Sequence, residues 1–543
     1  MSRLARIAAC TVLSITAATS TLAAPPKPDP VAAQWWADIA AIADDRNEGR
    51  QVGSAGYLRA ADYVVSRFKA LGLKPAGDND GYFQSVSFTE QVIDHTASTA
   101  RLIDAQGKPS PLPAGTDLLI SAGGGPRPVS VDAPLVFIGY GLHLPAQGYD
   151  DLAGVDLKGK IAVVLSGGPA DIAGPIKASN RSERAKFLKE AGAVGLITLV
   201  TPGQVEIPWD RRKLLAGQAG MYFADPALRD MPDGFFSGSV DPARSDGLFA
   251  GSAHSFAELA ALADASAPLP RFDLPLHLSA TVSAKFRQVD SPNLVGLLPG
   301  SDPRLRKQYL VVSAHLDHLG IGAPIGGKAT YSGAMDDASG VASVLDIAHR
   351  LRTGKRPRRS VLFVIVTAEE KGLLGSQYFA NRPTVPKAAI IADLNLDMPL
   401  PLWPLKSVLV QGEAESSLGA AARSVAKAQG LTLTPDPLPE RNSFTRTDQF
   451  SFVRAGVPAL AFKFGFPKGT PEFQIEHDWR ANRYHAPSDD LDQPGVLKDE
   501  AVKLDRYIAA IARLVANAAP RPVWLDTSVF KPATASAAPS SGR

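Results

Sequence analysis

The chain has 543 residues, of which 45% are hydrophobic and 20% charged, a composition typical of globular proteins. Its 57 Lys and Arg residues nearly balance 54 Asp and Glu residues, which leaves a net charge of only +3. This balance argues against a nucleic-acid partner, because nucleic-acid binding needs a concentrated basic face. The length predicts roughly three domain-sized units.

Residues 1–23 have the layout of a secretory signal peptide, with Arg3 and Arg6 before an apolar stretch and a small residue, Ala23, at the predicted cleavage site. The apolar stretch is too short to span a membrane, and no later segment reaches about 18 uninterrupted apolar residues. We therefore expect a secreted or periplasmic protein without stable membrane insertion. Cys10, the single cysteine, lies inside this segment, so the mature chain has no disulfide and no thiol chemistry.

The mature chain begins with helical periodicity between Trp35 and Leu73, where apolar residues recur every three or four positions. Short apolar strands separated by Gly and Pro turns follow from about residue 127 to 284 and predict a small β-rich domain. From about residue 288, buried-type strands alternate with helical stretches. This alternation predicts an α/β domain whose sheet is largely parallel and covered by helices.

Polar residues collect at the ends of the apolar runs in this last part, where α/β domains place their functional groups. These residues are His315, Asp317, Glu369, Glu370 and Asp397, with Asp336 and Asp337 before a predicted helix and His485 near the end. Imidazole and carboxylate groups together suit zinc and related divalent ions. The adjacent Glu369 and Glu370 would repel each other unless a cation neutralised one of them. One could then bind metal while the other takes a proton from the attacking water.

Each of these signals has an ordinary structural explanation. A histidine at a strand end is more often a hydrogen-bonded core residue than a ligand. Glu369 and Glu370 precede a predicted helix and would favour its N-terminus, and Asp336 with Asp337 could cap a helix near Ser339. The occurrence of the whole set in one α/β pattern is what favours a metal centre.

Residues 290–495 resemble the co-catalytic zinc peptidases of metallopeptidase family twenty-eight. The matching stretches are VVSAHLDHLG, GAMDDASGVA, TAEEKGLLGSQYF, NLDM, FTRTDQFSFVRAGVP and RYHAPSDD. NEGRQVGSAGYLRAADYVVSRFKALGLKPAG looks like the start of the same domain, and APLVFIGYGL with GKIAVVLSG is similar to an inserted protease-associated domain.

The resemblance implies an α/β fold, with a mostly parallel mixed sheet covered by helices on both faces and a small β-rich α/β insertion. It divides the chain into a signal peptide (1–23), a first catalytic part (24–126), the protease-associated insertion (127–284), a second catalytic part (285–520) and a partly disordered tail (521–543).

The resemblance also implies two Zn2+ per chain. It places His315, Asp336 and Asp397 in one site and Glu370 and His485 in the other, with Asp336 bridging the two ions. Glu369 would be the general base, and Asp317 would accept a hydrogen bond from His315 and fix its ring. Tyr484, Arg446 and Asp448 are tentative substrate-binding residues; the last two could instead stand behind the metal ligands. His318 receives no ligand role, because the set is already complete.

The implied function is that of an exported aminopeptidase acting on peptides. A carboxypeptidase or dipeptidase of the same fold is the nearest alternative, and the charge of the pocket distinguishes them, since an acidic group holds an ammonium and an arginine holds a carboxylate. Arg446 leaves that choice open. A single-zinc glutaminyl cyclase and a non-catalytic receptor-like module are disfavoured by the complete ligand set. The sequence does not indicate an oligomeric state.

Overall fold

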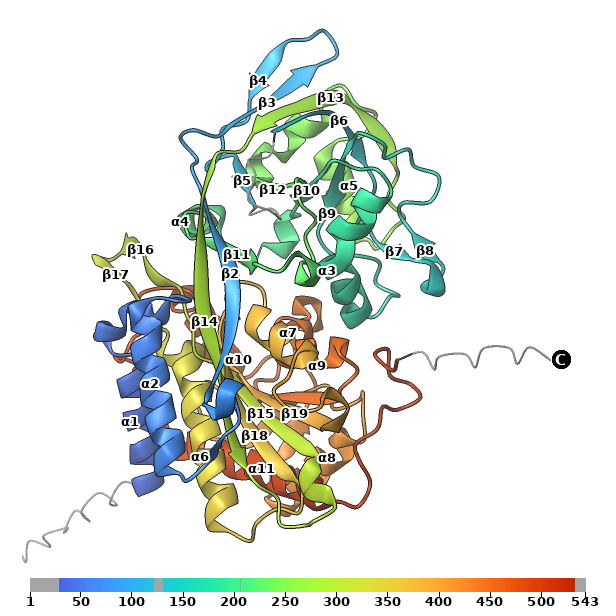
Figure 1. Ribbon diagram of the computed structural model, residues 1–543. Helices are drawn as coiled ribbons and strands as arrows, with labels where there is room; N and C mark the ends of the chain where they lie inside the picture. The colour runs from blue at the N-terminus through green and yellow to red at the C-terminus, as the bar shows by residue number, and fades with distance from the viewer. Residues whose placement is uncertain (1–28, 122–129, 206, 533–543) are drawn as a thin grey trace, which may run out of the picture.

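Two β-sheets organise the chain, one of ten strands and one of eight (Figure 1). The computed structural model describes residues 29–121, 130–205 and 207–532. The predicted signal peptide (1–23) and the end of the predicted tail (533–543) lie outside the described residues.

The ten-stranded sheet has the order β11-β2-β14-β18-β15-β19-β22-β20-β21, with β1 paired to β14. Its central strands β18, β15, β19 and β22 run parallel to one another. β14, β2 and β11 on one side and β20 on the other join antiparallel, so the predicted mostly parallel pattern applies to the centre of a mixed sheet. The strands span β1 Lys74–Pro75, β2 Phe83–Ile93, β11 Gly220–Phe223, β14 Ala284–Leu298, β15 Tyr309–His315, β18 Ser360–Val366, β19 Ile390–Leu396, β20 Ser407–Gln411, β21 Thr432–Thr434 and β22 Ala459–Phe464.

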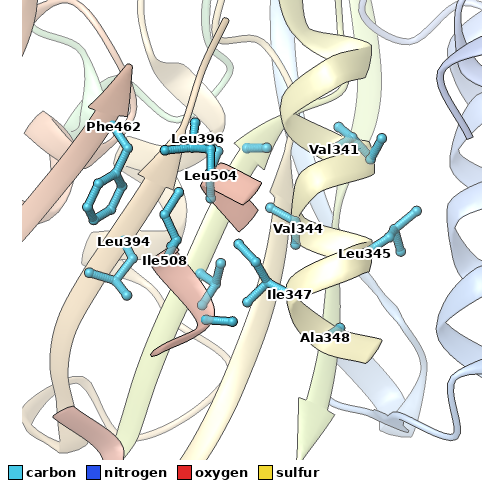
Figure 2. Packing of buried hydrophobic residues seen from close by; sticks show 14 of the residues in the cluster. Val341, Val344, Leu345, Ile347, Ala348, Leu394, Leu396, Phe462, Leu504 and Ile508 are labelled. Atoms are coloured by element: carbon cyan, nitrogen blue, oxygen red, sulfur yellow. The ribbon is translucent and has the colours of Figure 1, made fainter. Parts of the chain in front are cut away.

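Helices cover both faces of this sheet, as predicted. The larger core lies under α1 (Pro30–Ile42), α2 (Ala55–Ala70), α6 (Ser339–Thr353), α8 (Leu418–Ala428) and α11 (Lys498–Asn517). Figure 2 shows Val344 and Ile347 of α6 and Ile508 of α11 packed against Leu394 and Leu396 of β19. The opposite face is covered by α7 (Leu374–Asn381) and α9 (Gln449–Arg454). The central strands are buried almost along their whole length, and they are mostly apolar because both of their faces are covered.

The eight-stranded sheet has the order β4-β3-β13-β6-β9-β10-β12-β5 and lies above the larger sheet in Figure 1. Its strands are β3 Thr99–Asp104, β4 Pro109–Pro111, β5 Leu118–Ile120, β6 Ser130–Phe137, β9 Ile161–Leu165, β10 Gly195–Leu199, β12 Phe236–Val240 and β13 Phe272–Thr281, accompanied by α3 Gly174–Glu190 and α5 Phe256–Asp264. The sheet therefore begins at Thr99, upstream of the boundary predicted at residue 127, because β3, β4 and β5 already pair within it.

The segment that builds the eight-stranded sheet also pairs with the ten-stranded sheet and forms ion pairs with its domain. β11, from the middle of that part, pairs with β2 of the ten-stranded sheet. Ion pairs join Arg382 to Asp225 at 2.8 Å and Arg454 to Asp230 at 3.0 Å. Near the site described below, Nη1 of Arg211 donates to the carbonyl oxygen of Ala481 at 2.9 Å. Arg211 lies in α4 (Trp209–Ala216), and Ala481 lies in α10 (Pro471–Asn482).

The described part of the predicted tail, up to residue 532, lies against the ten-stranded sheet's domain. Nε1 of Trp524 donates to the carbonyl oxygen of Gly456 at 3.1 Å, and the ring of Phe530 packs against those of Phe444 and Phe450. Among the described residues, no helix combines the length and the apolarity needed to cross a membrane.

Candidate metal centre and active site

The predicted metal ligands come from five separate segments that meet at one edge of the ten-stranded sheet. His315 is the last residue of β15, Glu370 follows β18 and Asp397 follows β19. These three strands are parallel neighbours, so their carboxyl ends share one edge. Asp336 lies directly before α6, and His485 follows α10.

Asp336 stands between two imidazoles. Its Oδ1 lies 3.3 Å from Nε2 of His315, and its Oδ2 lies 3.3 Å from Nε2 of His485. The same Nε2 of His485 is 3.2 Å from Oε2 of Glu370. A carboxylate whose two oxygens face different histidines has the geometry of a bridge between two ion sites.

Two groups of buried donor atoms are compact enough to surround one ion each. His315, Asp336 and Asp397 form the first group, and His318, Asp336 and Glu370 form the second; in each, the donor atoms lie within 4.8 Å of one another. The first group consists of the three residues that were predicted to form one ion site. The second contains His318, to which the sequence interpretation gave no ligand role. His485, which was predicted to share this site, contacts Glu370 but is not part of the group. Nδ1 of His318 lies 2.7 Å from Oε1 of Glu370, so this histidine contacts a predicted ligand.

The donor set fits divalent cations of the zinc type. Nε2 of His318 and Oδ1 of Asp397 are buried without a hydrogen-bond partner in the described structure, and Nε2 of His315, Nδ1 of His318 and Oε1 of Glu370 have partners only within the cluster itself. Buried polar atoms are normally hydrogen-bonded, so several such atoms converging on one place indicate an ion-binding site. Nitrogen and oxygen donors of this kind suit zinc.

The electrostatics of the cluster also call for a cation. Burial lowers the pKa of His485, but Glu370 and Asp336 outweigh it and raise this pKa well above its usual range. The pKa of His315 is raised in the same way, against the effect of burial, by Glu369 and Asp336. The carboxylates thus attract positive charge strongly, and bound divalent ions would supply that charge in place of protons.

Two further aspartates hold the loops that carry the ligands. The carboxylate of Asp317 accepts hydrogen bonds from the backbone amides of Glu369 at 3.0 Å and Glu370 at 3.2 Å. The predicted contact from this carboxylate to the His315 ring is not made: Nδ1 of His315 lies 3.9 Å from Oδ1 of Asp317 and instead contacts its carbonyl oxygen at 3.1 Å. The carboxylate of Asp337 accepts from the amides of Gly340 and Met398, at 2.9 and 3.1 Å.

Arg50 is a buried support that the sequence interpretation missed. Its side chain is fully buried, and Nε donates to the carbonyl oxygen of Leu316 at 2.7 Å while Nη2 donates to that of Gly333 at 3.0 Å. One guanidinium therefore ties the segment after His315 to the segment before Asp336. No local signal in the loop NEGRQVGSAG could identify this role, because both partners lie more than two hundred residues away.

Glu369, predicted to be the general base, lies beside the ligand cluster. Its Oε2 lies 3.9 Å from Nε2 of His315, and its side chain lines a cavity of about 60 Å³ together with Asp336, Asp397 and His485. Burial, reinforced by the charges of Asp448 and Glu370, raises the pKa of Glu369 well above its usual range. A raised carboxyl pKa favours proton uptake during a reaction at neutral pH.

The tentative substrate-binding residues separate into two groups. Tyr484 and Arg446 line the cavity, and the Tyr484 ring stacks on His485 with a centroid distance of 3.8 Å. Asp448 is fully buried, and burial raises its pKa to about 7. Asp448 is not part of the cavity wall, and its charge contributes to the raised pKa of Glu369.

A wider groove also borders the cluster. It has a volume of about 400 Å³ and is bordered by Glu370 and His485, by Lys371, and by residues 218–221, which lead into and begin β11. His485 lines both the groove and the smaller cavity. The small cavity and the wider groove therefore meet the cluster at the same histidine.

Comparisons with known proteins agree with this geometry. Residues 293–511 match the family model described as Peptidase family M28. "Leupeptin-inactivating enzyme 1" of Streptomyces exfoliatus is 38% identical over 108 residues, which are 20% of this chain and 22% of that protein. The "Probable glutamate carboxypeptidase LAMP1" of Arabidopsis thaliana is 27% identical over 218 residues, 37% of this chain and 29% of that protein. The chain thus spans less than a third of the length of these curated relatives.

A solved structure, the aminopeptidase from Aneurinibacillus sp. strain AM-1, shares the fold with a TM-score of 0.51 at 19% identity, over 89% of this chain and 93% of that one. The family match covers every predicted metal ligand, and the described structure brings those ligands to one sheet edge. The chain therefore contains a segment, residues 293–511, that resembles Peptidase family M28 and includes every predicted metal ligand.

Proposed function

We propose that the chain is a zinc-dependent exopeptidase, an aminopeptidase that hydrolyses the bond after the N-terminal residue of a peptide. The observation that carries the proposal is the position of Glu369, which lines a small cavity directly beside the bridging carboxylate Asp336. A small space next to the reacting centre suits one terminal residue, and the wider groove suits the rest of the peptide.

His315, Asp336 and Asp397 would hold one Zn2+, and Asp336, Glu370 and His485 the other, with His318 beside Glu370. Bound there, the two ions would supply Lewis-acid polarisation of the scissile carbonyl and of the attacking water. Glu369 takes the proton from that water and passes it to the leaving amine. Tyr484, stacked on His485 at the cavity wall, is placed to donate a hydrogen bond to the carbonyl oxygen as negative charge develops.

A carboxypeptidase or dipeptidase activity is the second candidate, and the cationic residues on the cavity wall favour it. Arg441, Arg446, Lys463 and Arg480 line the same cavity. Guanidinium groups bind carboxylates, whereas the ammonium of a peptide N-terminus needs an acidic partner. Asp336, Glu369 and Asp397 are the acids on the wall that would serve an aminopeptidase.

Export belongs to the same proposal. Residues 1–23 would direct the chain out of the cytoplasm and would be cleaved off after export. N-terminal sequencing of the protein produced by its host would find a start close to residue 24, and a start at Met1 would contradict export.

The proposed function is tested by metal removal and restoration. The chelated protein should hydrolyse neither aminoacyl chromogenic substrates nor N-blocked dipeptides, and activity should return as zinc reaches two equivalents per chain. Cleavage of the aminoacyl substrates would support the aminopeptidase, and cleavage of the blocked dipeptides the carboxypeptidase. Full activity at one equivalent, or none on any peptide with two, would contradict the proposal.

A further inference from the structure

β11 is the outermost strand of the ten-stranded sheet and pairs on one side only, with β2 (Figure 1). The amide of Ala224, one residue beyond β11, donates to the carbonyl oxygen of Ser87 in β2 at 3.0 Å. Hydrogen-bonded pairs alternate with non-bonded pairs along an antiparallel ladder, so Tyr222 and Gly220 also bond to β2. The amide and the carbonyl group of Met221 therefore point away from β2, toward the outer edge of the sheet.

This outer edge is open at Met221. At the end of the strand, Nε of Arg229 donates to the carbonyl oxygen of Phe223 at 2.8 Å and Nη2 donates to that of Ala224 at 2.9 Å, so one arginine covers the edge there. Among the residues that the structure describes, none outside β2 hydrogen-bonds to the main chain of Met221. An unpaired strand edge is a template on which another extended chain can pair.

The open edge lies along the wider groove. The groove touches four consecutive residues, Gln218, Ala219, Gly220 and Met221. Side chains alternate between the two faces of a strand, so a groove that touches consecutive residues follows the edge of the strand and not one of its faces. Gly220 has no side chain that could keep a second backbone away, and glycine in a strand often marks such a close approach.

The groove begins at the metal cluster and does not end at β11. Glu370 and His485 border it. A second hollow of about 360 Å³ shares Gln218 and Gly220 with the groove and is lined in addition by residues 119–120 of β5, the outer strand of the eight-stranded sheet. Since an extended chain advances about 3.3 Å per residue, a peptide held at the cluster would need several residues to pass β11 and reach this hollow.

We propose that the outer edge of β11 binds the part of the substrate that does not enter the small cavity, through main-chain hydrogen bonds that add the peptide to the sheet as a further strand. This inference rests on the proposed function and names its substrate class, which is extended peptides of several residues. Main-chain pairing depends little on side chains, because every residue except proline offers the same donor and acceptor. The enzyme would therefore select its substrates by length more than by sequence beyond the terminal residue.

A length series tests the proposal with the zinc-loaded full chain. Initial rates of leucine release are measured for leucyl-alanine amide and its homologues with two to five alanines, and for the N-acetylated series that ends in leucine. In the series that is cleaved, kcat/KM should increase at least about tenfold from the shortest to the longest member, the effect of one or two net hydrogen bonds. A kcat/KM that does not depend on length would overturn the inference while leaving a working peptidase. Release of leucine from neither series by a chain with two zinc ions would instead contradict the proposed function.

N-methylation distinguishes main-chain pairing from other contacts in the groove. The amides of the longest cleaved peptide, apart from the scissile one, are methylated one at a time. Only every second amide of a paired strand faces its partner, so kcat/KM should fall about tenfold at alternating positions and change little at the positions between them. A loss that is uniform along the peptide, or no loss at any position, would overturn the inference.

A pair of variants places the pairing on β11. Met221→Pro removes the amide hydrogen that faces the groove, and the ladder with β2 should remain because prolines are tolerated on edge strands where the amide faces outward. Met221→Ala is the matched control, since it also removes the methionine side chain but keeps the amide hydrogen. The ratio of kcat/KM between the longest and the shortest peptide should be about tenfold lower in the proline variant than in the alanine variant. Equal ratios would overturn the assignment to β11, and the N-methylated peptides test the pairing in the unsubstituted protein if the proline variant does not fold.

Discussion

Nδ1 of His318 lies 2.7 Å from Oε1 of Glu370, and both side chains are almost completely buried. Oε2 of the same carboxylate faces His485 at 3.2 Å. Glu370 therefore stands between two imidazoles, and one of them, His318, lies outside the predicted ligand set.

His318→Ala should lower zinc affinity about 10- to 100-fold at one of the two sites, the usual effect of losing a group that orients a ligand. Competition against a chelating indicator measures the two affinities separately. His349→Ala is the control, because His349 is exposed on α6. Two unchanged affinities in the His318 variant would show that this side chain does not support the ion site.

Glu369→Gln should reduce kcat about 10²- to 10⁴-fold, the range lost with a positioned general base, while two zinc ions remain bound. In the unsubstituted protein, activity should fall as pH decreases, because protonated Glu369 cannot accept a proton. A variant that kept substantial activity would disprove the assignment of the base.

Gly340→Ala should disturb the metal centre through Asp337 and Leu396, which are not ligands themselves. A Cβ at this position would lie 2.3 Å from Oδ1 of Asp337 and 2.5 Å from the carbonyl oxygen of Leu396. We expect a loss of about 1–3 kcal/mol in the free energy of unfolding, as for other overpacked sites, together with weaker zinc binding. Urea denaturation measures the first and metal competition the second. Gly247→Ala is the control, because its Cβ would meet no atom within 4 Å, and equal midpoints for the two variants would contradict the prediction.

A buried acidic pair between α6 and α11 should make stability depend on pH. Burial, and then the charge of Asp346, raise the pKa of Asp505 well above its ordinary value. The folded chain consequently binds more protons here than the unfolded chain, so the free energy of unfolding should decrease as pH rises above about 4. Asp505→Asn should flatten this dependence and stabilise the protein at pH 8 relative to the unsubstituted chain.

Urea titrations at pH 5 and pH 8 compare the two proteins. Asp499→Asn serves as the control, because Asp499 is exposed in the first turn of α11. A stability difference between the two pH values that Asp505→Asn leaves unchanged would show that this pair does not titrate as described.

The features predicted well from the sequence are those with a local chemical signal. β15, β18 and β19 are apolar runs of seven residues that end next to His315, Glu369 and Asp397, so both the strands and the polar groups after them are readable. The start of the second sheet was not readable. β4 and β5 are only three residues long, and β4 consists of Pro-Ser-Pro, a composition that propensity assigns to a turn.

Features that depend on distant contacts were missed. Arg50 acts on carbonyl groups that the fold alone brings to it, and Glu476 orders two arginines from different segments. His318 was visible in the motif but received no ligand role because the set of six residues was already complete. A complete ligand motif does not exclude a further histidine beside it, and only the distance from His318 to Glu370 revealed this contact.

The ribbon formed by β2 and β14 pairs without interruption from Ala284 opposite Ile93 to Leu294 opposite Phe83, and Figure 1 shows it rising from the lower sheet toward the upper one. Beyond its upper end the chain enters β3 from one strand and leaves β13 into the other. The two halves of the molecule are thus joined by a continuous antiparallel pair of strands rather than by a flexible linker. An attempt to excise the upper half and rejoin the ends would also remove β11 from the border of the lower sheet and expose the outer side of β2.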